Sequence, residues 1–297
     1  MAPVTNITTR ENVPEKFVLS NTSAELVEVP TLKLDAQNRC LNLSPVQQSQ
    51  INPSTSLPTP VKSDFLAQEL VGYDRDLKEI LVSCFKFGFK VGILGNLTNR
   101  FSINHKSARE NPQQVYEKLA KETLKLRVAG PFKNIPFDNF ICSPLGLVSK
   151  SLPGKFRLIH DLSYPKGNSV NLLIPPENSQ VKYDDIDVVV KLVKYFGRNA
   201  KMSKCDIEDA FRIVAIHPSD YHLLGFIWNN LYYYDRCLPM GASSSCQIFE
   251  RFSCAFQWIM ENKYHVAGMS HIIDDFLFVG PPNSEKCQID LNNLLSL

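Results

Sequence analysis

The stretch His271-Ile272-Ile273-Asp274-Asp275-Phe276-Leu277-Phe278-Val279-Gly280 places two adjacent carboxylates between apolar runs that are typical of β-strands. Burying one unpaired carboxylate is unfavourable, and two adjacent carboxylates repel each other unless a cation lies close to them. A hydrophobic hairpin with Asp274 and Asp275 at its tip therefore indicates a divalent metal site. Hard oxygen ligands favour Mg²⁺ or Mn²⁺ over zinc. The alternative interpretation is a solvated Asp-Asp turn between two strands.

The charge of the chain is unevenly distributed. The sequence has 297 residues, is 44% hydrophobic and carries a formal net charge of +2, which allows one large domain or two small ones. Residues 100–160 contain 11 Lys or Arg against 4 acidic residues, so the remainder is net acidic. A basic segment beside an acidic one fits a polyanion held over a metal site. A solvated helix face explains part of this basic excess.

The cysteines and the N-terminus bear on the cellular compartment. The eight cysteines include no C-x-x-C pair and no histidine at zinc-finger spacing, which indicates reduced thiols in an intracellular protein. The N-terminus lacks an apolar run of the signal-peptide type, and no segment approaches the length of a membrane span. We therefore expect a soluble, non-secreted protein of the cytoplasm or nucleus with no membrane partner.

The chain divides into four expected segments. The first is rich in Ser, Thr, Asn, Gln and Pro, and we expect it to be disordered or weakly structured. A helical region follows, in which Ser63 or Asp64 caps a first helix with apolar positions from Leu66 to Cys84. A second helix begins at Asn111-Pro112. The expected boundaries are 1–62, 63–137, 138–200 and 201–297.

A basic β-hairpin is expected between residues 143 and 162. Two apolar strands flank the turn Ser151-Leu152-Pro153-Gly154-Lys155, with cations at both ends of the turn. Arg157 can bind a phosphate group bidentately, and Lys150 can act as a point charge. The alternative is that these charges only protect an edge strand from pairing with other chains.

The second half of the sequence alternates strands and helices. Asp206 ends a short strand that begins at Lys201, and a sharp turn leads into an expected strand from Arg212. A hairpin is expected around Asn229-Asn230, followed by a long helix with one continuous apolar face. The last expected helix, Ser284 to Leu297, has no evident packing partner.

Three carboxylates can be assembled from these elements. Asp206 lies at a strand end, and Asp274-Asp275 follow about seventy residues later on a hairpin. Three carboxylates from neighbouring strands of one sheet can hold two metal ions roughly 3.5–4 Å apart, an arrangement suited to in-line phosphoryl transfer. A two-metal nuclease would use the same carboxylates, but it gives no reason for the basic hairpin.

Three motifs resemble those of a known family. Lys204-Cys205-Asp206-Ile207-Glu208-Asp209-Ala210-Phe211, Leu238-Pro239-Met240-Gly241-Ala242-Ser243-Ser244-Ser245 and Ile272-Ile273-Asp274-Asp275 look like motifs A, B and C of reverse transcriptases. The upstream runs around Ser143-Pro144-Leu145-Gly146 and Phe156-Arg157-Leu158-Ile159-His160-Asp161 are similar to those of the DIRS-like, tyrosine-recombinase group of retrotransposons. The resemblance covers about residues 85 to 290.

The resemblance implies a fold, an activity and partners. The fold would be α+β, the right-hand fold of polymerases, with fingers, an incomplete palm of antiparallel sheet with helices on one face, and no thumb. The activity would be RNA-directed DNA synthesis by a nucleotidyltransferase that uses two Mg²⁺ or Mn²⁺ ions. The partners would be an RNA/DNA template–primer and dNTPs. Only 22 residues follow Asp275, so we expect a truncated copy or part of a retrotransposon polyprotein, with any RNase H or tyrosine recombinase domain outside this chain.

The resemblance also assigns roles to single residues. The catalytic and metal-binding set would be Asp206, Asp274 and Asp275, with the Ile207 carbonyl as a further ligand. Phe211 would lie under the sugar and exclude a 2′-hydroxyl, and Gly241 would permit close approach of the template–primer. The nucleotide-binding set would be Lys150, Arg157, Asp209, Ala210, Phe211, Met240 and Gly241.

The sequence departs from the usual family pattern at two places. Met240 stands where many reverse transcriptases have Gln, and Ile272-Ile273 replaces a pair that usually contains Tyr. Both changes are compatible with the DIRS-like group. The sequence leaves one alternative function open, an inactive or co-opted retroelement remnant that only binds nucleic acid.

Overall fold

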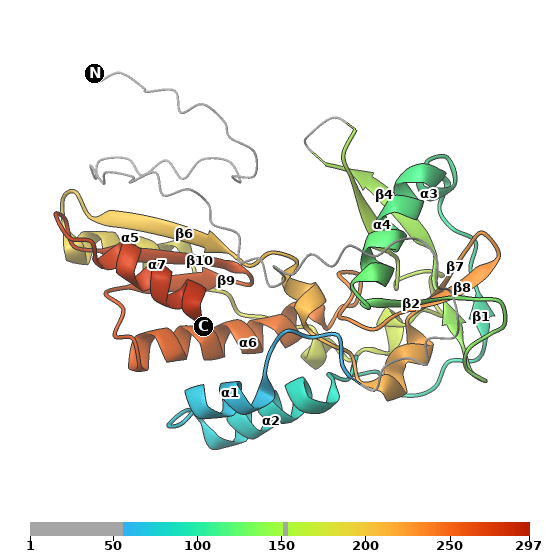
Figure 1. Ribbon diagram of the computed structural model, residues 1–297, viewed down its shortest axis with the longest axis horizontal. Coiled ribbons are helices and arrows are strands. Elements are labelled where there is room, and N and C mark those ends of the chain that lie inside the picture. The colour runs from blue at the N-terminus through green and yellow to red at the C-terminus, as the bar shows by residue number, and fades with distance from the viewer. Residues whose placement is uncertain (1–55, 151–153) are drawn as a thin grey trace.

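The computed structural model describes residues 56–150 and 154–297 of the chain. The protein is a mixed α+β molecule in which one set of elements surrounds a three-stranded sheet and another surrounds a five-stranded sheet (Figure 1). Most of the expected weakly structured segment 1–62 lies outside the described residues, as does the Ser151–Pro153 part of the basic turn.

The three-stranded sheet, here called the carboxylate sheet, consists of β6 (Lys201–Asp206), β10 (Asp275–Gly280) and β9 (Met269–Ile272), in the order β6-β10-β9. Both pairings are antiparallel, and Asp275 of the central strand lies opposite Asp206. Ile273 has a φ of 57° in the turn between β9 and β10. The expected strand ending at Asp206 and the expected Asp-Asp hairpin are therefore both confirmed.

One face of the carboxylate sheet packs on α6 (Ser245–Asn262) and α7 (Lys286–Ser296). Side chains alternate between the two faces of a strand, and Phe276 and Phe278 of β10 both point to this face, where they are fully buried. They share a hydrophobic core with Phe252 of α6 and Leu291 of α7. This face forms the interior of the molecule.

The opposite face is covered by α5 (Ile186–Phe196). Val189 and Val193 of this helix form a separate apolar cluster with Met202 of β6 and Val279 of β10. The cluster lies toward the end of the sheet remote from Asp206, because Met202 and Val279 pair four positions away from the Asp206–Asp275 pair. Helices therefore cover both faces of this sheet, and the expectation of helices on one face is wrong.

The last helix has a packing partner, contrary to the sequence-based expectation. The buried residues of α7 are Cys287, Asp290, Leu291 and Leu294. The Ser203 hydroxyl donates to the Cys287 carbonyl (3.1 Å), and the Asp290 carboxylate accepts from the Ala267 amide (3.1 Å). The sequence pattern of α7 is only weakly amphipathic, so its docking depends on contacts with β6 and β10 rather than on its own periodicity.

The five-stranded sheet is mixed and has the order β1-β3-β7-β8-β2. The pairs β1–β3 and β3–β7 are parallel, whereas β7–β8 and β2–β8 are antiparallel. Asn229 and Asn230 both have positive φ values, which suits a two-residue hairpin turn, so the expected hairpin is confirmed. The strands are β1 (Arg100–Phe101), β2 (Val128–Phe132), β3 (Ile141–Cys142), β7 (Gly225–Trp228) and β8 (Leu231–Asp235).

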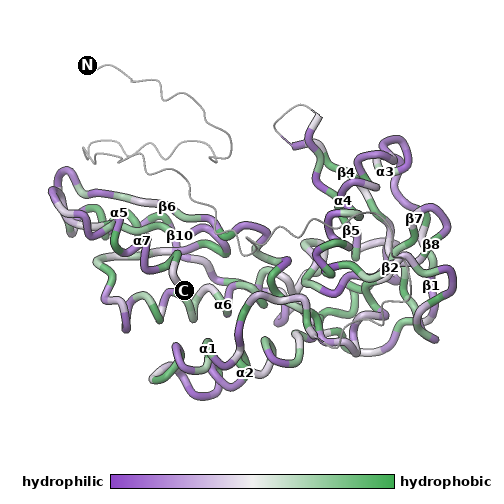
Figure 2. The backbone as a smooth tube through the Cα atoms, in the orientation of Figure 1, coloured by the Kyte–Doolittle hydropathy of each residue, from purple (hydrophilic) through white to green (hydrophobic). Residues whose placement is uncertain are grey.

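The basic hairpin consists of β4 (Leu145–Ser149) and β5 (Phe156–His160), which pair in antiparallel register. One face carries Leu147, Phe156 and Leu158 into an apolar cluster with α4 (Pro112–Leu124). The other face carries Arg157, which is exposed. The expected strand–turn–strand is confirmed for its described residues, and hydrophilic segments gather around its tip and around α3 (Lys106–Arg109) in Figure 2.

The N-terminal region contains two helices, α1 (Ser63–Glu69) and α2 (Arg75–Phe87), where the sequence predicted one. Gly72 has a φ of 96° in the break between them, and the Asp74 carboxylate accepts from the Leu77 amide (2.9 Å), which caps α2. Lys62 is the N-cap of α1, so the expected capping role of Ser63 or Asp64 is wrong. Phe85 of α2 packs on Phe252 of α6.

The remaining connections include short segments held by specific contacts. Residues 56–62 form no helix or strand, but the Thr59 hydroxyl donates to the Ile213 carbonyl (2.6 Å) and Arg236 donates to the Ser56 carbonyl (3.0 Å). The expected strand from Arg212 is instead a 3₁₀ helix, Ala210–Ile213, followed by extended chain. The other 3₁₀ helices are Asn171–Leu173, Pro176–Asn178 and Pro218–Leu223.

Replacement of Leu291 by Ala tests the docking of α7. Leu291 is fully buried, so Leu291→Ala should lower the free energy of unfolding by about 2–5 kcal/mol through lost burial and a residual cavity. Ile289→Ala is the matched control on the same helix, because Ile289 is 49% exposed and should change stability by less than about 0.5 kcal/mol. Urea unfolding measures both variants. Equal stability losses would show that α7 does not pack as described.

Candidate active site

The three predicted carboxylates lie at one end of the carboxylate sheet. Asp206 ends β6 and Asp275 begins β10, and the two residues pair directly across the sheet. Asp274 occupies the turn, where its carbonyl accepts from the Ile207 amide (3.1 Å). The Asp206 end of β6 points toward the elements of the five-stranded sheet and the basic hairpin (Figure 1). The structure therefore brings together Asp206, Ile207, Asp274 and Asp275.

The electrostatics of these residues favour a bound cation. Burial raises the pKa of the Asp274 carboxyl above its usual range, and the negative charge of Asp275 adds to this rise. The Lys204 ammonium, which lies 3.0 Å from an Asp275 carboxylate oxygen, acts in the opposite direction on Asp274. The donor set consists of carboxylate and carbonyl oxygens, which are the ligands that Mg²⁺ and Mn²⁺ prefer. The chemistry of this donor set therefore fits the expected divalent ions, which would draw the three carboxylates together.

The turn after β6 is held by charges from the segment between α4 and β2. Asp209 adopts a left-handed conformation (φ 56°), and its carboxylate accepts from Lys125 (2.9 Å) and Arg127 (2.7 Å). Burial alone would raise the pKa of Asp209, but the hydrogen bonds from Arg127 and Lys125 lower it to about 2. The side chain of Asp209 is thus engaged by the protein, and its carbonyl accepts from the Arg212 amide (2.6 Å). The contact of the Asp209 and Ala210 backbone with a nucleotide remains a prediction.

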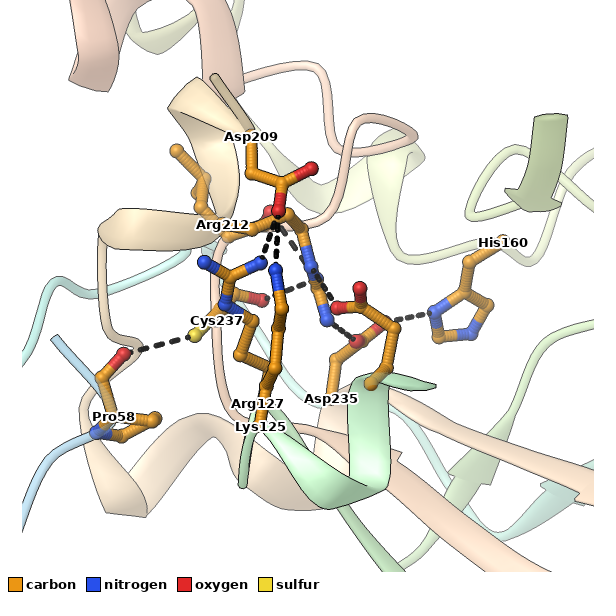
Figure 3. Close-up of polar contacts among 10 residues, drawn as sticks. Pro58, Lys125, Arg127, His160, Asp209, Arg212, Asp235 and Cys237 are labelled. Carbon is orange, nitrogen blue, oxygen red and sulfur yellow. Dashed lines mark hydrogen bonds and ion pairs between the residues drawn. The ribbon is translucent and has the colours of Figure 1, made fainter. Parts of the chain in front are cut away.

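A buried ionic network, shown in Figure 3, lies beside this turn. The Arg212 guanidinium contacts Asp235 of β8 (2.7 Å) and Glu122 of α4 (3.0 Å). Asp235 also contacts the imidazole of His160 in β5 (2.9 Å). Burial opposes the charge of Arg212, but the anionic partners raise its pKa, led by Asp235. The network joins the turn after β6 to the basic hairpin, the five-stranded sheet and α4.

Gly241 makes a close approach to the protein backbone. A Cβ atom at this position would lie 2.0 Å from the His160 carbonyl oxygen, so any larger residue would displace β5. The side-chain Nδ2 of Asn171 also donates to the Gly241 carbonyl (2.8 Å). The contact with His160 requires glycine here independently of any nucleic acid, while the predicted contact with a template–primer remains a prediction.

The other predicted nucleotide-binding residues differ in exposure. Met240 is exposed, whereas Phe211 is only 8% exposed and packs on Phe249 of α6. Lys150 and Arg157 are both exposed on the basic hairpin. The roles of these residues toward a nucleotide remain predictions.

The ionic network of Glu122, His160, Arg212 and Asp235 was not expected from the sequence. One signal was present, because Arg212 interrupts the apolar run Ala210-Phe211-Arg212-Ile213-Val214, and a charge in such a run usually has a buried partner. The other three members of the network come from α4, β5 and β8, and sequence spacing does not identify them.

Two observations concern the cysteines and the helices of the described residues. The seven cysteines within the described residues are free thiols, four of them buried. No helix in residues 56–150 and 154–297 is both long enough and apolar enough to cross a membrane.

Comparison with known proteins identifies the fold. No protein-family model matches the sequence, and no curated protein matches it. Solved structures do match. The foamy viral protease–reverse transcriptase in complex with dsDNA has a TM-score of 0.50 and 18% identity, over 80% of this chain and 49% of that chain. The same viral protein in complex with an RNA/DNA hybrid has a TM-score of 0.52 and 16% identity, over 80% of this chain and 31% of that one.

These similarities define a class at the level of the fold. The chain has the α+β fold found in the foamy viral reverse transcriptase, and this confirms the sequence-based resemblance at that coarse level. The chain spans less than half of the length of these solved chains. The particular retroelement group and the residue roles are not part of what the fold shows.

Replacement of Arg212 tests the ionic network. Arg212→Ala leaves Asp235 buried beside a single remaining partner, and removal of one member of a buried pair costs about 3–5 kcal/mol. The matched control is Arg75→Ala, which breaks an exposed pair with Glu79 and should leave the urea midpoint unchanged. If Arg212→Ala left the urea midpoint unchanged, as Arg75→Ala should, the buried network would be contradicted.

Replacement of Gly241 separates its structural role from a role in binding. Gly241→Ala should lower the free energy of unfolding by about 1–3 kcal/mol, because its Cβ would overlap the His160 carbonyl. At Gly146, the control, an added Cβ would meet side-chain atoms rather than backbone, His105 at 3.2 Å and Ser107 Oγ at 3.7 Å, so Gly146→Ala should cost less. A Gly241→Ala protein with unchanged stability but weaker binding to duplex would show that the glycine serves nucleic acid alone.

Proposed function

We propose that this chain contains the catalytic centre of an RNA-directed DNA polymerase. The observation that carries the proposal is the meeting of Asp206 with Asp274 and Asp275 at one end of an antiparallel sheet, in a fold similar to that of a reverse transcriptase. Two divalent ions, Mg²⁺ or Mn²⁺, would activate the attacking 3′-hydroxyl and neutralise the triphosphate and the leaving group. Asp206, Asp274, Asp275 and the Ile207 carbonyl would hold these ions.

The residues around the carboxylates would prepare the site for this reaction. Lys204 contacts Asp275 at 3.0 Å and partly balances the charge of the cluster. The amide of Ile207 holds the Asp274 carbonyl, so the turn between β9 and β10 has a fixed position relative to the end of β6. Such preorganisation keeps the ligands at the positions that the reaction needs.

The basic hairpin would bind the anionic reactants. Arg157 is exposed on the face opposite the apolar cluster and makes no ion pair with the described residues. A guanidinium in that state can engage phosphate oxygens bidentately. Together with Lys150, Arg157 would bind the incoming dNTP or the template strand. The foamy viral neighbours, whose structures contain dsDNA or an RNA/DNA hybrid, support a nucleic-acid partner.

The retroelement group and the choice of deoxynucleotides are inferred from the sequence motifs. Membership of the DIRS-like group rests on the resemblance of motifs A, B and C, and so does the selection of deoxynucleotides by Phe211. Phe211 packs firmly on Phe249, which supports a fixed steric gate in preference to a mobile one. On this proposal the chain would act within a retrotransposon polyprotein.

A second candidate function is nucleic-acid binding without catalysis. The exposed cations of the basic hairpin favour it, because they do not depend on the carboxylates. Binding of this kind would weaken steeply with salt and would need no divalent ion.

Primer extension on an RNA template with dNTPs and Mg²⁺ separates the two functions. The parent chain should extend the primer, and Asp274→Asn should reduce the rate by about 10³-fold, because metal-ion stabilisation is worth several kcal/mol and about 1.4 kcal/mol is a factor of ten. Asp76→Asn, an exposed position on α2, is the control and should retain the parent rate. A folded parent that binds duplex but extends no primer would establish the second candidate function.

A further inference from the structure

A cluster of potential metal ligands lies next to the turn between β9 and β10, which carries Asp274. Glu250 and Cys254 are one helical turn apart on α6, and His271 lies on β9. One ligand atom from each residue falls within 4.8 Å of the other two. Within residues 56–150 and 154–297, no other group of three His, Cys, Asp or Glu residues meets this criterion. We refer to these three residues as the α6–β9 cluster.

The distances in the α6–β9 cluster fit a tetrahedral ion. A glutamate oxygen and a histidine nitrogen on one tetrahedral zinc lie about 3.4 Å apart, and a cysteine sulfur and a histidine nitrogen about 3.6 Å apart, from typical bond lengths. In the structure, Glu250 Oε1 lies 3.2 Å from His271 Nε2. Cys254 Sγ lies 3.9 Å from the same nitrogen. The ligand atoms of Glu250 and Cys254 lie within 4.8 Å of each other, so all three ligands can converge on one ion after small side-chain movements.

A neighbouring side chain fixes the orientation of the histidine. Gln257 Nε2 donates to Glu261 (2.8 Å), so Gln257 Oε1 faces His271 and accepts from its Nδ1 at 2.5 Å. Burial opposes the charge of the ring, but the contacts with Cys254 and Glu250 raise the pKa of His271 to about 9. A bound ion would therefore displace the proton on Nε2, the atom that faces Glu250 and Cys254, while Nδ1 keeps its proton. Metal-binding histidines typically have such a partner on their other ring nitrogen.

The burial of two ligands and the solvent exposure of the third also suit a bound ion. Glu250 and His271 are buried, and the His271 ring stacks on Phe276 of β10, so both ligands are held in place. Cys254 is exposed and gives the cluster a path to solvent. Three protein ligands leave a fourth position for water. Thiolate and imidazole ligands select zinc-like ions over Mg²⁺.

We propose that Glu250, Cys254 and His271 bind one zinc-class divalent ion, at a site separate from the three aspartates. Glu250 contributes Oε1 to the ion while its Oε2 accepts from the Ile273 amide (3.2 Å). The Ser253 hydroxyl donates to the Ile273 carbonyl (2.5 Å). The ion would therefore join α6 to the turn that carries Asp274 and would hold that turn in position.

Cobalt titration of the purified chain tests this site. Co²⁺ bound to a thiolate gives a near-ultraviolet charge-transfer band, which should saturate at one ion per chain. Zn²⁺ should remove the band by competition, and excess Mg²⁺ should not. Cys254→Ser should abolish the band without unfolding the chain, because the position is exposed. Gln257→Ala should weaken cobalt binding about 10–100-fold.

Two control variants separate this site from the rest of the protein. Cys246→Ser changes a half-buried cysteine of the same helix and should retain the band. Asp274→Asn should also retain it, so the test is independent of polymerase activity. Absence of the band in the parent, its persistence in Cys254→Ser, or its loss in Cys246→Ser or Asp274→Asn would overturn the proposal. Cobalt-free circular dichroism of each variant confirms that it is folded.

Discussion

The ion pair between Arg212 and Asp235 joins the turn after the carboxylate sheet to the five-stranded sheet. Arg212 follows the turn after β6, and Asp235 ends β8. Asp235 also contacts His160 of the basic hairpin. Such buried pairs do not necessarily increase stability over an apolar core, but breaking one is costly, so arrangements that separate the two charges are disfavoured. We infer that this network orients the basic hairpin relative to the carboxylates. Gly241 adds to the same constraint, because it lets the chain pass within van der Waals contact of His160.

The carboxylate end of the sheet is arranged in two layers. The outer layer is Asp206, Asp274 and Asp275, whose mutual repulsion is relieved in part by Lys204. The inner layer is the α6–β9 cluster, in which Glu250 and Ser253 bond both backbone groups of Ile273. Positions of ligands must be held within a fraction of an ångström for phosphoryl transfer, and supporting residues behind a site usually provide that rigidity. The proposed catalytic turn thus depends on α6 as much as on its own strands.

The packing of the helices explains how such a short sheet is stable. The carboxylate sheet has three strands, and α6 with α7 covers one face while α5 covers the remote part of the other. The part of the second face that carries Asp206 and Asp275 lies outside this cluster, and among the described residues both side chains stay partly exposed. Covering the rest with α5 buries Met202 and Val279 and leaves the carboxylates accessible. A fold similar to that of the foamy viral reverse transcriptase therefore leaves open the surface that the proposed reaction needs.

The sequence by itself determined the features that depend on local pattern. These are the Asp274-Asp275 hairpin, the strand to Asp206, the Asn229-Asn230 turn and the basic hairpin, because alternation and turn residues act over a few positions. Tertiary structure decided the partners of α7, the covering of both sheet faces, the ionic network and the α6–β9 cluster. Those features join residues that are distant in the chain. Spacing along the sequence carries no information about such contacts, since packing and burial arise only when the whole chain folds.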